Sequence, residues 1–157
     1  AFRIGPPDQP TLKARKLGEI RSVLVASPAY LAEHPAPKRP EDLAHHRCII
    51  DTNRRRPAHW VFVEGAQENA VTVPSRFMVN SARVARDLAV AGQGIAFCPR
   101  FVLDDDLEAG RLVSLLDGFA APGHPISAVY LEGRTLPLKV RALIDFALRD
   151  MRQVAIA

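Results

Sequence analysis

The chain has 157 residues, of which 48% are hydrophobic and 24% are charged, with a formal net charge of +4. This length and composition are typical of one compact soluble domain and argue against disorder. The 21 Lys and Arg residues are spread along the chain, a balance that permits nucleic-acid contact without predicting it. No apolar run approaches the length of a membrane span, and we expect neither a signal peptide nor a membrane partner.

The apolar and turn patterns predict strands that alternate with helices. The expected strands, in chain order, are 11–26 with a bend at Gly18, 47–51, 60–63, 71–73, 76–79, 95–98, 112–116 and 126–131. The expected helices begin at Pro28 and Pro40, span 81–91, run from Pro99 to Gly110, and span 136–151. This alternation predicts an α/β fold with mainly parallel sheets.

Local signals mark the ends of several helices. Ser27 can accept a hydrogen bond from a first-turn amide, and Pro28 suits the first helical position. Asn80 or Ser81 can cap the helix that follows, and Gly92 can end that helix in the left-handed conformation.

The two cysteines, Cys48 and Cys98, each lie in an apolar run. They are too few for a disulfide framework, so we interpret them as reduced core residues of a cytosolic protein, with a single disulfide as the alternative. An apolar strand suppresses the thiolate, which disfavours Cys98 as a catalytic nucleophile.

Metal and cofactor sites are also disfavoured. The five histidines are His34, His45, His46, His59 and His124. Adjacent histidines cannot easily face one ion from a short helix, and no HExxH or CxxC pattern is present, so surface or capping roles are favoured. The Gly92-Gln93-Gly94 turn follows a helix instead of opening one, so it lacks the geometry of a dinucleotide loop and no cofactor is expected.

Two charged clusters allow more than one interpretation. The acidic run Asp104–Asp106 with Glu108 points around a short helix, so a solvated face is favoured over a divalent-cation site. The basic run Arg54–Arg56 lies in a loop and is interpreted first as a solvated cluster. The alternatives are that one arginine reaches an anionic ligand or that the run contacts DNA.

Two loops have the chemistry of a small-ligand site. Thr52 and Asn53 follow a strand, and ligands of open α/β sheets collect beyond the carboxyl ends of strands. Asn80 and Ser81 begin a helix whose free amides favour a carboxylate. Simple turn formation and helix capping are the alternatives.

A series of segments in fixed order carries a family resemblance over almost the whole chain. They are RIGP at 3–6, KLGEIRSVLVAS at 16–27, ASPAYL at 26–31, PEDLAHH at 40–46, AGQGIAFCP at 91–99, LEAGRLVSLL at 107–116 and ISAVYLEGRTLPLKVRALIDF at 126–146. Together they resemble the effector-binding domain of LysR-type transcriptional regulators.

The resemblance implies a fold like that of type 2 periplasmic binding proteins, with two α/β subdomains and an effector in the cleft between them. Residues 1–22 and 113–157 would belong to an incomplete first subdomain, and residues 23–112 would form the second. The effector-binding residues implied in this chain are Gly5, Thr52, Asn53, Asn80 and Ser81.

The resemblance also implies what lies outside this sequence. Family members bind DNA through an N-terminal winged helix-turn-helix and dimerise through a linker helix, and neither is in these 157 residues. The chain opens on the strand-like segment Phe2–Gly5, so we expect an N-terminally truncated piece of a cytoplasmic homodimer or higher homo-oligomer. Its partner would be a small-molecule effector, and the helix N-termini and arginines of this chain favour a carboxylate.

We therefore expect an effector sensor and not an enzyme. The first alternative is a solute-binding protein of a transport system, which shares the two-lobed architecture. The second is an enzyme that uses Cys98 and a histidine.

Overall fold

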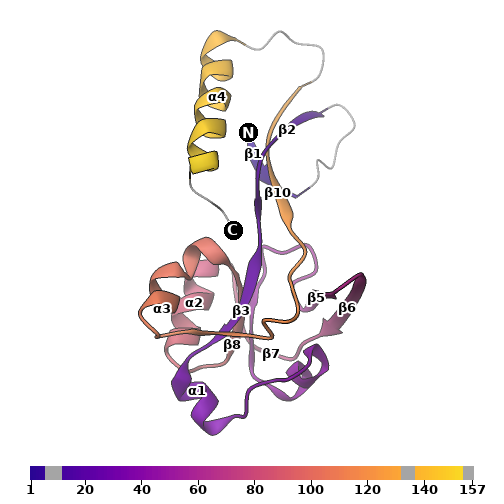
Figure 1. Ribbon diagram of the computed structural model, residues 1–157, viewed down its shortest axis with the longest axis vertical. Coiled ribbons are helices and arrows are strands. Elements are labelled where there is room, and N and C mark those ends of the chain that lie inside the picture. The colour runs from indigo at the N-terminus through magenta and orange to yellow at the C-terminus, as the bar shows by residue number, and fades with distance from the viewer. Residues whose placement is uncertain (6–11, 132–136, 154–157) are drawn as a thin grey trace. The chain divides into compact units, whose positions relative to one another are not determined.

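The computed structural model describes residues 1–5, 12–131 and 137–153 (Figure 1). The chain divides into two compact units, Ala1–Arg21 with Gly123–Ala157, and Ser22–Pro122. The resemblance placed residues 113–122 with the first unit. The structure keeps them in the second unit, because Val113–Leu115 forms a strand that pairs with the strand Ser22–Ala26.

The first unit contains a three-stranded antiparallel sheet in the order β1–β10–β2. These strands span Phe2–Ile4, His124–Leu131 and Leu12–Ile20. Ile126 pairs with Gly18 and Ser127 pairs with Lys16, so Leu17 is an extra residue at a β-bulge. This irregularity lies where the sequence predicted a bend. Thr11, the expected first residue of the strand, lies outside the described residues.

Helix α4 (Leu138–Gln153) packs on this sheet through residues at helical spacing. Ile144 forms a buried cluster with Leu17 and Ala128, supported by further apolar side chains from the helix, namely Val140, Ala147 and Leu148. An ion pair between Arg15 on β2 and Asp145 on α4, 2.9 Å long, joins the same two elements. The helix predicted from its apolar stripe is confirmed, although its expected first residue, Leu136, lies outside the described residues.

The second unit is built on a five-stranded sheet in the order β7–β4–β8–β3–β9. These strands span Ser75–Val79, Cys48–Asp51, Ile95–Pro99, Ser22–Ala26 and Val113–Leu115. Strand β4 is parallel to β7 and β8, whereas β3 is antiparallel to β8 and β9.

The prediction of mainly parallel sheets is therefore wrong in its detail. Among the described strands, only the two pairings of β4 are parallel. The buried apolar run of β8 indicated a central strand correctly, but such a run does not reveal the direction of its neighbours.

Alternating side chains bury both faces of the five-stranded sheet. Ile49 points to the face that is covered by α2 (Ala82–Val90), whereas Cys48 and Ile50 belong to the opposite core. The opposite face packs against the hairpin of β5 (His59–Glu64) and β6 (Gln67–Thr72) through buried Trp60 and Phe62. Figure 1 shows α2 and the hairpin on opposite sides of this sheet.

The helices predicted to begin at Pro28 and Pro40 do so, whereas the single helix predicted from Pro99 to Gly110 is divided into two short helices. Ser27 Oγ accepts a hydrogen bond of 3.3 Å from the Tyr30 amide at the start of α1 (Pro28–Glu33). A 3₁₀ helix, η1, spans Pro40–His45, a second, η2, spans Arg100–Val102, and α3 spans Asp104–Glu108. Ser81 occupies the N-cap position of α2, but its side chain makes no capping hydrogen bond.

The turn from α2 into β8 depends on two glycines. Gly92 adopts the left-handed conformation at φ +73°, as predicted for a helix stop. Gly94 has φ +156°, and a Cβ atom added there would collide with the carbonyl oxygen of Arg47. The same carbonyl accepts the Ile95 amide at 2.8 Å, so the strand cannot move away without losing that bond.

We predict that Gly94→Ala lowers the free energy of unfolding by about 2 kcal/mol or more, because backbone strain and the Arg47 collision add together. Chemical denaturation of the chain measures this. Gly118→Ala is the matched control, since nothing lies within 4 Å of a Cβ there. Equal stability of the two variants would contradict the close approach of Gly94 to Arg47.

Candidate functional site

The parallel strands of the second unit end at one edge of the sheet. Because β7, β4 and β8 run in the same direction, the residues that follow them lie along a single carboxyl edge. Thr52 and Asn53 follow β4, and Asn80 and Ser81 follow β7. Four of the five predicted effector-binding residues therefore belong to two neighbouring turns.

Direct hydrogen bonds join these two turns. The Thr52 amide and hydroxyl donate to the Val79 carbonyl at 2.8 and 3.1 Å. The Asn53 side-chain amide donates to the Asn80 carbonyl at 2.7 Å. The structure thus brings Thr52 and Asn53 together with the turn that carries Asn80 and Ser81.

Asp51 orients Asn53 and was not among the predicted site residues. Its Oδ1 accepts both the backbone amide and the side-chain amide of Asn53, each at 3.0 Å. This is the pattern of an Asx turn, and an aspartate two residues before an asparagine at a strand end is the sequence signal for it. Among the described residues, none donates a hydrogen bond to Asn53 Oδ1, so this oxygen is available to a ligand.

The fifth predicted residue, Gly5, lies in the first unit. Its amide donates to the Pro125 carbonyl at 2.8 Å, and its φ of +93° is one that glycine adopts readily. Gly5 follows β1 in the same way that the other four residues follow their strands.

The arginine run after Asn53 divides into two kinds of residue. Arg55 and Arg56 are exposed, as expected for a solvated cluster. Arg54 is only partly exposed, and its Nη2 donates to Ser22 Oγ and to the Phe97 carbonyl, both at 2.7 Å. Its guanidinium carbon lies 4.4 Å from the centre of the Phe97 ring. The prediction of a solvated cluster is wrong for Arg54, because its side chain folds back onto the ends of β3 and β8.

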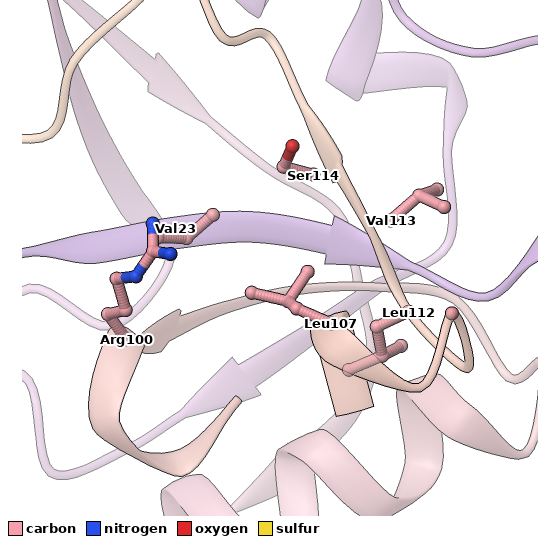
Figure 2. Close-up of a pocket in the computed structure, with 7 residues that line it drawn as sticks. Val23, Arg100, Leu107, Leu112, Val113 and Ser114 are labelled. Carbon is pink, nitrogen blue, oxygen red and sulfur yellow. The ribbon is translucent and has the colours of Figure 1, made fainter. Parts of the chain in front are cut away.

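A separate open hollow of about 380 Å³ lies beside the edge strand β9 (Figure 2). Its lining comes from β3, β9 and the segments around α3, and consists of Val23, Arg100, Leu107, Gly110, Leu112, Val113 and Ser114. Arg100, the charged member of this set, is already paired with Asp104 at 3.3 Å. None of the predicted site residues lines the hollow, so it is a second candidate for ligand contact.

The acidic run of α3 is not simply a solvated face. Asp106 is 3% exposed, and its carboxylate accepts hydrogen bonds from Arg86 of α2 and from Arg111. Burial alone would raise the pKa of Asp106, but the hydrogen bonds from the two guanidinium groups outweigh burial and lower it. The expectation of a solvated face fails here because the sequence does not reveal which aspartate faces α2.

Both cysteines are buried and unpaired. Burial raises the pKa of the Cys48 thiol to about 12, and burial is also the largest cause of a Cys98 pKa of about 12. The expected reduced core cysteines are confirmed for this structure. A thiol with such a pKa carries almost no thiolate at neutral pH, which argues against nucleophilic chemistry at Cys98.

Two of the five histidines have a packing role around Tyr30. The His34 ring stacks on the tyrosine ring with centroids 4.3 Å apart. The Tyr30 hydroxyl accepts the Arg47 amide at 3.1 Å and lies 3.1 Å from His46 Nδ1. Burial lowers the pKa of His46, which favours a neutral ring that accepts the tyrosine proton. In the described ranges, no three potential ligand side chains gather closely enough to hold a metal ion.

A family model described as the LysR substrate binding domain matches residues 1–152. The chain belongs to this family. None of the helices in the described part of this LysR-family domain has the length and apolar character needed to cross a membrane.

The relatives of this domain are transcriptional regulators. The HTH-type transcriptional regulator CrgA of Neisseria meningitidis serogroup C is 34% identical over 152 residues, which cover 96% of this chain and 50% of CrgA. The CrgA regulatory domain superposes with a TM-score of 0.81 at 32% identity, covering 95% of this chain and 73% of that domain.

A full-length LTTR-family structure, the Vibrio cholerae virulence activator AphB, gives a TM-score of 0.82 at 33% identity, covering 95% of this chain and 50% of AphB. These matches confirm the predicted fold class. The chain spans about half the length of the curated relatives that it matches.

We predict that Asp106→Asn lowers the free energy of unfolding by about 2 kcal/mol at neutral pH, because it removes the charge that holds Arg86 and Arg111. Asp104→Asn is the control, since that side chain is 49% exposed. Urea denaturation at several pH values measures both variants.

The pH dependence follows from the sign of the pKa shift. The Asp106 pKa is lower in the folded chain, so its contribution is present above the unfolded pKa and is lost as pH falls through the folded pKa. The difference in the free energy of unfolding between wild type and Asp106→Asn should therefore disappear in acid. Equal free energies of unfolding at neutral pH, or a difference that persists in acid, would contradict the buried ion pair.

Proposed function

We propose that this chain is the effector-sensing domain of a LysR-type transcriptional regulator. A small molecule would bind at the carboxyl edge of the second unit and thereby control transcription. The observation that carries the proposal is the bonded pair of turns, in which Asn53 is fixed by Asp51 and Asn80. Membership of the LysR family supports it, as does the similarity to the transcriptional regulator CrgA and the virulence activator AphB.

The proposed binding residues are Thr52, Asn53, Asn80 and Ser81, with Gly5 from the first unit. The two compact units would be the two lobes of the sensor. The boundaries between the lobes would then lie at residues 21/22 and 122/123, instead of 22/23 and 112/113. Polar turns that follow strands are the usual position of ligand contacts in open α/β sheets. The Asn53 carbonyl and the side chains of Asn80 and Ser81 would supply hydrogen bonds that select the effector.

Regulation would arise from differential affinity. An effector that binds one arrangement of the two lobes more tightly than another shifts the population toward that arrangement. In the complete cytoplasmic protein, that shift would change how subunits of a homodimer or higher oligomer hold their winged helix-turn-helix domains on DNA. The domain would bind and release its effector without chemistry, consistent with two buried thiols whose pKa values are about 12.

The transport alternative receives no support from the relatives. CrgA is a transcriptional regulator and AphB is a virulence activator, and these matches cover about 95% of the present chain. We therefore propose the regulatory role alone.

We predict that Asn53→Ala and Asn80→Ala each weaken effector binding by the complete regulator about fivefold, the loss expected for one hydrogen bond. Isothermal titration with the compound that induces its target promoter measures this. Gln67→Ala, on the exposed strand β6, is the control. Native affinity in both asparagine variants would exclude these turns as the effector site.

A further inference from the structure

Arg54, at the carboxyl edge of the second unit, has hydrogen-bond donors that are not used within the described residues. A guanidinium has five N–H donors, and the two on Nη2 are directed to Ser22 Oγ and the Phe97 carbonyl. These bonds and the Phe97 ring hold the side chain in place. The Nε and Nη1 donors have no partner among the described residues, and they are not enclosed in the interior.

The charge of Arg54 is not matched by a carboxylate. Within the described residues, Arg54 makes no ion pair, whereas Arg15, Arg86 and Arg111 each contact an aspartate directly. Asp51 attracts Arg54 electrostatically without forming an ion pair with it, and Asp51 Oδ1 instead accepts hydrogen bonds from Asn53. The exposed neighbours Arg55 and Arg56 add positive charge to the same loop.

A partly buried guanidinium without a directly paired carboxylate is costly. Burial is the largest cause that lowers the pKa of Arg54, which means that its surroundings disfavour the charged form. A neutral side chain in place of Arg54 could donate the same two hydrogen bonds to Ser22 and Phe97, and its desolvation would cost less than that of a guanidinium. A bound anion would offset that cost and use the free donors.

The position of Arg54 relates it to the proposed effector site. Ser22 and Pro99 are register partners where β3 begins and β8 ends, so the guanidinium lies over Phe97 beside the carboxyl end of β8. Asn80 follows β7, which is two strands away in the order β7–β4–β8. Two strand spacings are about 10 Å, a span that a small organic acid can bridge.

We propose that Arg54 is the anion-binding residue of this edge and that the effector is a small carboxylate, its acid group at Arg54 and its other polar groups at Asn53 and Asn80. This proposal rests on the proposed function, since it names the ligand class of the same site. Arg54 would select for charge, because a neutral analogue leaves the guanidinium without a directly paired anion. Arg55 and Arg56 would only raise the local potential.

The test uses the full chain labelled with ¹⁵N and five probes, namely succinate, benzoate, succinamide, benzamide and inorganic phosphate. At least one of the two acids should bind at millimolar concentration and shift the Arg54 Nε–H resonance, and its amide should bind far more weakly. Arg54→Gln should weaken acid binding about tenfold or more, the loss expected for a charged hydrogen-bond partner. Arg55→Gln and Arg56→Gln are matched controls and should bind nearly as wild type does.

Several results would overturn the proposal. They are equal binding of acid and amide, native affinity in Arg54→Gln, tighter binding of phosphate than of either acid, or no response of Arg54 to either acid. If Arg54→Gln does not fold by circular dichroism, the Nε–H resonance of the wild-type chain decides the question.

The same titrations separate this proposal from the proposed site. If succinamide or benzamide binds and the binding depends on Asn53 and Asn80 but not on Arg54, the proposed effector site stands and the carboxylate proposal fails. If succinate or benzoate binding depends on Arg54 but is unchanged in Asn53→Ala and Asn80→Ala, Arg54 is an anion-binding residue and the effector site lies elsewhere.

Discussion

The parallel pairing of β4 with β7 and β8 is the constraint on which the second unit depends. Parallel strands must end at the same edge, so the turns after them become neighbours although they are far apart in sequence. The Thr52 and Asn53 bonds to Val79 and Asn80 follow directly from that pairing. An antiparallel β7 would put its end at the opposite edge and leave Asn53 without its partner.

Packing on both faces keeps this edge rigid. Ile49 is buried toward α2, and Ile50 is buried toward Trp60 and Phe62, so β4 can neither slide nor rotate without exposing one of them. The hydrogen bonds of Arg54 also connect the loop after β4 to the start of β3 and to β8. A rigid edge that retains unpaired polar groups is suited to ligand selection, because little order has to be imposed when the ligand binds.

The sequence predicted features that depend on local chemistry. Ser27 and Gly92 act where a hydroxyl and a left-handed residue are needed at helix ends, and the apolar stripe of α4 follows from its spacing alone. The family resemblance led to the fold class and the candidate turns. The burial of Asp106 and of Arg54 could not be predicted, because each depends on a partner from a distant element. Strand direction also escaped prediction, since an apolar run is the same in both directions.

We propose that the effector binds at the polar edge after β4 and β7. Hydrogen exchange of the complete regulator, measured with and without its inducing effector, reports directly on this edge. If the effector binds at this edge, exchange slows at the amides of residues 52–54 and 80–82, which belong to the two bonded turns. Protection confined to residues 107–114, around the hollow of Figure 2, would place the ligand there and exclude the edge after β4 and β7 as the binding site.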